Sequence, residues 1–146
     1  MKSVAHILKA KADQRVYSIA PAASVLDAVK LMAEKNIGAL VVMEGEKIVG
    51  IITERDYARK IVLMARSSKD TPVRDIMTAS AMYVSPLQTN EECMALMTET
   101  RVRHLLVVDS GKLIGLVSIG DLVKDIISEQ KFMIQQLEHY ITGERG

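Results

Sequence analysis

Short apolar runs and amphipathic stretches alternate along this chain in an order typical of small units that mix α and β structure. Residues 39–43 and 48–52 are apolar and rich in β-branched side chains, and a short polar turn separates them. This arrangement predicts a β-hairpin of two buried strands. Apolar positions over residues 25–33 recur at helical spacing, and Ser24 with Asp27 forms the pattern of a capping box in front of them.

The same order of elements returns in the second half of the chain. A shift of 65 residues aligns residues 17–62 with residues 82–127 without a gap and gives 10 identities in 46 positions. Chance would give about three identities at ordinary residue frequencies. Thr89 and Glu92 repeat the capping pair. The chain is therefore predicted to hold two tandem β-α-β-β-α repeats of an α+β fold.

Polar residues 66–72 form the predicted linker between the repeats. We expect residues 1–66 to make the first repeat with a short helical lead-in, and residues 67–127 to make the linker and the second repeat. Residues 128–146 are predicted as a C-terminal helix. The three parts together account for the whole chain.

The C-terminal helix carries a wide apolar stripe that has to be covered. Its apolar residues recur at a seven-residue interval: Ile126, Ile127, Met133, Ile134, Tyr140 and Ile141, with Leu137 between the last two pairs. Contiguous apolar patches of this size are uncommon on monomers. The stripe therefore predicts a homodimer.

Composition narrows the possible functions. The chain has 146 residues, 49% of them hydrophobic, and a net charge of +1, which argues against binding nucleic acid or a membrane surface. No apolar run approaches the roughly 20 residues that a membrane span needs, and no signal peptide is evident. Cys93 is the single cysteine, which we interpret as a small core residue in a reducing compartment. We expect a cytoplasmic protein.

A hydroxyl and a carboxylate stand three residues apart after the last strand of each repeat. Thr53 and Asp56 follow the strand of the first repeat, and Ser118 and Asp121 take the equivalent places in the second. Such a pair can simply cap a helix. A carboxylate at a helix start can also accept two hydrogen bonds from a vicinal diol. The two roles can coexist, and the duplication favours a ligand site.

These strand ends and the lead-in Val73–Thr78 resemble the signature of the CBS-domain family. The resemblance covers about residues 4–127 and implies that the two repeats pack as a pseudo-twofold pair with two clefts. It implies ligands such as AMP, ADP, ATP, NAD(H) or adenosyl-methionine, with the Ser/Thr-x-x-Asp steps holding the ribose hydroxyls.

Further candidate ligand contacts lie beside these steps. Arg103 and His104 precede a strand of the second repeat, where Gly38 and Ala39 stand in the first, so we expect the two clefts to be unequal. The resemblance implies that a basic residue there meets a phosphate, and His104 would carry charge mainly below about pH 6.5. The remaining candidates are Arg55, Ile19, Ala20, Pro21, Val84 and Ser85.

No recognisable catalytic or metal-binding motif appears in the chain, so we expect no enzyme, no catalytic or metal site and no required cofactor. The favoured function is a regulatory module that senses energy or redox state through an adenine nucleotide and acts on a separate protein that the sequence does not identify. The alternatives are a dimerisation scaffold without ligand and a sensor of adenosyl-methionine.

Overall fold

The computed structural model describes residues 2–142, which form two compact units. Arg15–Met82 makes one unit, and the described residues before and after it make the other. Both units contain a three-stranded sheet with helices, so the predicted α+β class is confirmed.

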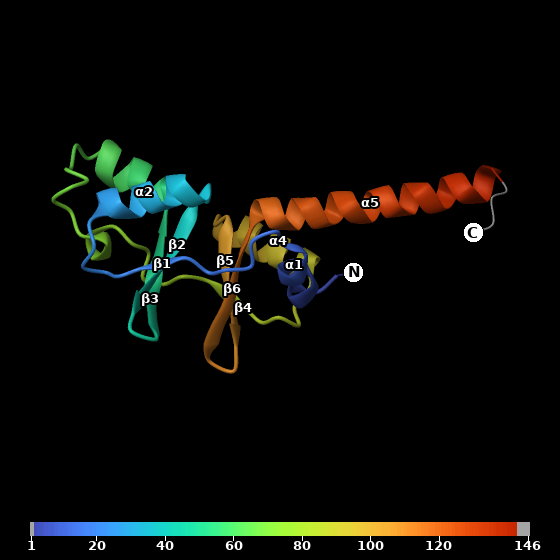
Figure 1. Ribbon diagram of the computed structural model, residues 1–146, viewed down its shortest axis with the longest axis horizontal. Helices are drawn as coiled ribbons and strands as arrows, with labels where there is room; N and C mark the ends of the chain where they lie inside the picture. Colours follow the sequence, from blue (N-terminus) through green and yellow to red (C-terminus); the bar gives the residue numbers. More distant parts are fainter. Residues whose placement is uncertain (1, 143–146) are drawn as a thin grey trace. The chain divides into compact units, whose positions relative to one another are not determined.

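In the unit Arg15–Met82 a short strand lies parallel to the first strand of a hairpin. The sheet order is β1-β2-β3, with β1 parallel to β2 and β2 antiparallel to β3. Its helix α2 packs on the sheet and beside the helical segment that follows β3 (Figure 1). The elements are β1 (Ser18–Ile19), α2 (Val25–Lys35), β2 (Ala39–Glu44), β3 (Lys47–Thr53), α3 (Glu54–Tyr57) and a π-helical turn (Ala58–Val62).

The core of this unit is aliphatic because β2 is buried on both faces. Four consecutive residues of β2, Ala39–Val42, are fully buried, as expected of a strand covered on both sides. The side chains that pack with β2 come from α2, β3, the π-helical turn and the lead-in: Val25, Ala28, Met32, Ile52, Ile61, Val73 and Ile76.

The second unit repeats the same topology. Its sheet has the order β4-β5-β6, again with one parallel and one antiparallel pairing. Both hairpins have a register irregularity at the equivalent place, between Val42 and Met43 and between Val107 and Val108. The elements are α1 (Val4–Ala10), β4 (Tyr83–Val84), α4 (Asn90–Thr100), β5 (His104–Asp109), β6 (Lys112–Ser118) and α5 (Ile119–Thr142).

Each lead-in packs in the unit of the other repeat. Helix α1 packs on β6 and α5, whereas a 3₁₀ turn at Val73–Asp75 and the following Thr78 pack in the unit Arg15–Met82. The predicted boundaries at residues 66 and 127 follow the order of the repeats in the sequence. In the structure, by contrast, each lead-in belongs to the packing unit of the other repeat. The predicted linker also packs within the unit Arg15–Met82, because the carbonyl of Thr71 accepts a hydrogen bond from Val25 N.

Glycines at the same place in both repeats let the lead-ins approach the strands. A Cβ on Gly50 would lie 2.6 Å from the carbonyl oxygen of Thr78, and one on Gly115 would lie 2.7 Å from a methyl carbon of Leu8. In the first case the close neighbour is backbone, since Ile51 and Thr78 exchange two hydrogen bonds of 3.0 and 2.8 Å. The identity of Gly50 and Gly115 in the alignment therefore has a packing cause.

Helices α2 and α4 begin at the predicted caps, but with different completeness. Thr89 and Glu92 make both bonds of a capping box. Ser24 accepts from Asp27 N, whereas the reciprocal bond that the sequence predicted is not among the contacts of the described residues. Of these two helices, α4 therefore has the full box.

Helix α5 continues far beyond the part that packs on its unit (Figure 1). Leu122 is fully buried, whereas every residue from Lys131 to Thr142 is exposed. The predicted C-terminal helix is thus the extension of the second helix of repeat two. Among the described helices, none is long and apolar enough to cross a membrane.

Candidate functional site

The first hydroxyl–carboxylate pair forms a closed capping box at the end of β3. Thr53 Oγ1 accepts from Asp56 N at 3.1 Å, while Asp56 Oδ2 accepts from Thr53 N at 3.0 Å and from the Thr53 hydroxyl at 3.1 Å. The extended backbone of Thr53 turns into helix α3 at this point. The capping role that the sequence allowed is therefore made here by both side chains.

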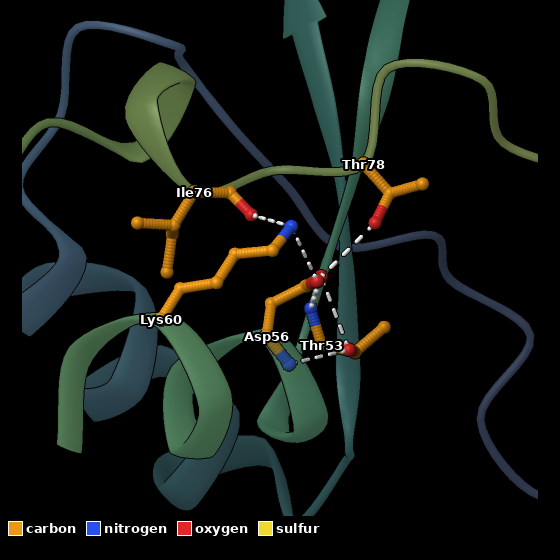
Figure 2. Close-up of polar contacts among 5 residues, drawn as sticks. All are labelled: Thr53, Asp56, Lys60, Ile76 and Thr78. Atoms are coloured by element: carbon orange, nitrogen blue, oxygen red, sulfur yellow. Dashed lines mark hydrogen bonds and ion pairs between the residues drawn. The ribbon is translucent and has the colours of Figure 1, made fainter. Parts of the chain in front are cut away.

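Two further groups hold the other oxygen of Asp56 (Figure 2). The Thr78 hydroxyl donates to Oδ1 at 3.2 Å, and Lys60 Nζ lies 3.1 Å from the same atom. Lys60 also donates to the carbonyl of Ile76 at 2.9 Å. The Asp56 side chain is only 10% exposed, so these contacts replace water around a buried charge.

The second pair is more open. Ser118 Oγ accepts from Asp121 N at 3.2 Å, and Asp121 Oδ2 accepts from Ser118 N at 2.9 Å. Lys11, from the segment after α1, lies 3.0 Å from the same Oδ2 and donates to the carbonyl of Leu116. All these contacts of the carboxylate use one oxygen, and the Asp121 side chain is 16% exposed.

His104 faces this second pair across the hairpin. It is the first residue of β5 and pairs with Ser118 in the ladder. Burial lowers the pKa of His104 below its ordinary value of 6.5, the nearby Asp121 raises the pKa, and the charges of Lys11 and Arg103 lower it. The folded environment therefore keeps the His104 ring neutral to a lower pH than its ordinary pKa of 6.5 would give.

This shift predicts a loss of stability on acidification. The unfolded chain binds a proton at His104 near pH 6.5, whereas the folded chain binds it only at lower pH. The stabilising contribution is fully present above about pH 6.5 and is lost as the pH falls toward the folded-state value. We expect the melting temperature to fall more between pH 7.5 and 5.5 in the native chain than in His104→Asn, measured by thermal denaturation. Equal falls in the two proteins would show that His104 is not the titrating group.

The predicted ligand residues fall into two groups within each unit. Ala39 pairs with Thr53, whereas Ile19 pairs with Val42. The two groups are thus three residues apart along β2, about 10 Å. The group at the Thr53 end holds Gly38, Ala39, Thr53, Arg55 and Asp56, and the group near β1 holds Ile19, Ala20 and Pro21.

The unit of the second repeat has the same division. Ser118 pairs with His104, and Val84 pairs with Val107. Arg103 is exposed, and its carbonyl accepts from Ile119 N at 2.9 Å. Arg103, His104, Ser118 and Asp121 therefore lie at one end of β5, and Val84 with Ser85 lies three to four residues further along. Ligand contact by these residues remains a prediction.

Sequence reasoning missed the groups that surround the two carboxylates. Lys60 stands four residues after Asp56, the spacing at which opposite charges meet on a helix. Thr78 and Lys11 are distant in sequence from the carboxylates that they contact. Each reaches its carboxylate because its lead-in packs with the other repeat, and no short sequence pattern predicts that packing.

The described part of the chain contains no group of three or more His, Cys, Asp or Glu side chains that could hold a metal ion. Cys93 is fully buried, and burial together with the charge of Glu92 raises the pKa of its thiol. A protonated, inaccessible thiol is the core residue that the sequence predicted.

Comparison with known proteins identifies the family. The model of the CBS domain matches residues 4–63 and 73–128, so that two copies stand in tandem. The chain belongs to the CBS-domain family. A solved structure of a CBS-domain protein from Burkholderia ambifaria MC40-6 is 61% identical, with a TM-score of 0.86 over 88% of this chain and 96% of that chain. The CBS resemblance and the fold predicted from the sequence are confirmed.

Two further relatives bear on ligand and location. The Arabidopsis thaliana CBS domain-containing protein CBSX3, mitochondrial, is 46% identical over 125 residues, which are 82% of this chain and 61% of that protein. This chain thus spans less than two thirds of that relative. The structure of CBSX2 in complex with AMP is 26% identical, with a TM-score of 0.72 over 88% of this chain and 98% of that chain.

Proposed function

We propose that this protein is a regulatory module that binds an adenine nucleotide through a Ser/Thr-x-x-Asp step. The observation that carries the proposal is the Ser118–Asp121 step. Its carboxylate sits at the first turn of a helix, is held in place by Ser118 N, and keeps an oxygen without a partner among the described residues. An ionised carboxylate in this position accepts hydrogen bonds from a ribose diol.

AMP is the first ligand to test, because a CBS-family neighbour of the same fold has been solved with AMP. ADP, ATP and NAD(H) carry the same adenosine group and belong to the proposal as energy or redox signals. Adenosyl-methionine also carries it and is the alternative ligand. We further propose that the protein is not an enzyme and works in the cytoplasm, although one relative is named as mitochondrial.

We also propose that the protein is a homodimer joined by helix α5 of two copies. Ile134 and Leu137 are 54% and 59% exposed and lie on one stripe of the helix. Lys131 and Glu138 stand seven residues apart, so they lie on the same side of the helix beside this stripe. In an antiparallel pair, Lys131 of each copy would face Glu138 of the partner subunit, so charge complementarity favours a second copy as the occupant.

A thermal-shift screen tests the nucleotide proposal. A ligand that binds only the folded chain stabilises it by about 2.7 kcal/mol at a hundredfold excess over Kd. For a chain of this size, that corresponds to a rise of roughly 5–10 °C in the melting temperature. We expect such a rise with at least one of AMP, ADP, ATP, NAD, NADH and adenosyl-methionine, and none with adenine-free ribose phosphate. An unchanged melting temperature with all six would favour the ligand-free scaffold.

A further inference from the structure

The two Ser/Thr-x-x-Asp steps differ in how many hydrogen-bonding places of their carboxylates are already filled. An ionised carboxylate offers about four lone-pair sites, two on each oxygen. Asp56 is contacted on both oxygens within its own unit: Thr53 N and the Thr53 hydroxyl donate to Oδ2, the Thr78 hydroxyl donates to Oδ1, and Lys60 Nζ forms an ion pair with Oδ1 at 3.1 Å. A diol that approached Asp56 would have to displace one of these groups.

Asp121 has the opposite arrangement. Ser118 N at 2.9 Å and Lys11 Nζ at 3.0 Å both bind Oδ2. Oδ1 receives no donor from the described residues and is not among their buried, unsatisfied atoms, so solvent can reach it. Two lone pairs remain on Oδ1, which is the number that a vicinal diol needs for its two hydroxyl donors.

The hydroxyls beside the two carboxylates differ in the same sense. The Thr53 hydroxyl accepts from Asp56 N and donates its own proton to Asp56 Oδ2. The Ser118 hydroxyl accepts from Asp121 N at 3.2 Å, and no hydrogen bond from this hydroxyl to the carboxylate is found among the described residues. Ser118 can therefore donate a hydrogen bond to a ligand oxygen without breaking a contact of its own unit.

Lys60 further limits the access of a ligand to the Asp56 carboxylate. Its ammonium group bridges Asp56 Oδ1 and the carbonyl of Ile76, and Thr78 is fixed beside it by two backbone hydrogen bonds to Ile51. The carboxylate thus joins β3, the π-helical turn and the lead-in within one unit. Removing the partners of Asp56 would leave a buried charge unpaired. This destabilises the fold more than the loss of the capping hydrogen bond alone.

We propose that Ser118–Asp121 is the only one of the two steps that binds a ribose, and that Thr53–Asp56 is a structural lock that attaches the lead-in to the first repeat. This assignment rests on the proposed function, which it makes specific: one nucleotide per chain, with the diol on Asp121 Oδ1. The duplicated motif has therefore diverged into one binding copy and one structural copy.

Titration calorimetry with AMP on the full chain tests the assignment. We expect one binding event per chain in the native protein. Asp121→Asn should weaken the binding of AMP at least tenfold while leaving the melting temperature within about 3 °C of the native value. Asp56→Asn, the matched control in the other repeat, should leave the AMP affinity within about threefold and lower the melting temperature clearly more.

If Asp56→Asn does not fold, Thr78→Val is the second variant of the lock, because it removes one donor from Asp56 and keeps the charge. It should lower the melting temperature and leave AMP binding unchanged. Binding that is lost in the Asp56 or Thr78 variant and kept in Asp121→Asn would overturn the assignment alone, as would two equal events per chain. Absence of AMP binding in the native protein would overturn the assignment together with the AMP form of the proposed function.

Discussion

Replacing Ile134 and Leu137 together by glutamate is expected to convert the proposed homodimer into a monomer. Both side chains lie on the apolar stripe of α5 and are more than half exposed in the single chain. Burying such a side chain contributes about 1.5–3 kcal/mol, and a symmetric dimer loses each contact twice. The four new carboxylates would also repel one another across the helix pair. The dissociation constant should rise by at least about a hundredfold, measured by sedimentation equilibrium.

The matched control places the same charges on the other side of the helix. Ser128 and Gln135 are exposed and lie away from the stripe, so Ser128→Glu with Gln135→Glu should leave the dimer intact. If both double variants stay dimeric, α5 is not the interface. A native chain that is monomeric at micromolar concentration would contradict the homodimer itself.

Gly50→Ala is expected to destabilise the chain by about 1–3 kcal/mol, the usual cost of overpacking a closed site. The added methyl group would lie 2.6 Å from the carbonyl oxygen of Thr78 and 3.2 Å from the sulfur of Met77. The backbone bridge between Ile51 and Thr78 has to open to make room. Chemical denaturation of the full chain measures the change in the free energy of unfolding.

Gly115→Ala is the control, because it adds the same methyl group at the equivalent place in the other repeat. Its close neighbours are the methyl carbons of Leu8, at 2.7 and 2.8 Å, which belong to the end of a flexible side chain. Alanine in a strand is also favoured over glycine by roughly 0.5–1 kcal/mol. We expect a change below about 1 kcal/mol at this position. Equal losses at both glycines would contradict the lead-in contact as the cause.

Local patterns predicted most of the fold. The strands expected at 39–43 and 48–52 appear as Ala39–Glu44 and Lys47–Thr53, because a β-branched apolar run bounded by a polar turn has few other stable conformations. The second hairpin was predicted as strands at 105–108 and 113–117, and it appears as His104–Asp109 and Lys112–Ser118. Thr53 and Asp56 were paired correctly for the same reason: a cap depends on residues three apart, and this spacing is visible in the sequence.

The features that the sequence did not predict depend on contacts between distant parts of the chain. Lys11 meets Asp121 across 110 positions, and the repeat alone would have placed Lys11 with the first repeat. The lowered pKa of His104 follows from its burial, which the sequence does not display. The difference between Asp56 and Asp121 is also invisible in the alignment, where the two residues are identical, since it arises from Thr78, Lys60 and Lys11.

Comparison of AMP with 2′-deoxy-AMP by titration calorimetry tests most directly whether the protein recognises a ribose through a carboxylate. The deoxy ligand keeps the adenine and the phosphate and lacks one donor to the carboxylate. A hydrogen bond to a charged group contributes about 1.5–3 kcal/mol, so 2′-deoxy-AMP should bind roughly ten- to hundredfold more weakly than AMP. Equal affinities for the two nucleotides would contradict ribose recognition by the Ser/Thr-x-x-Asp steps.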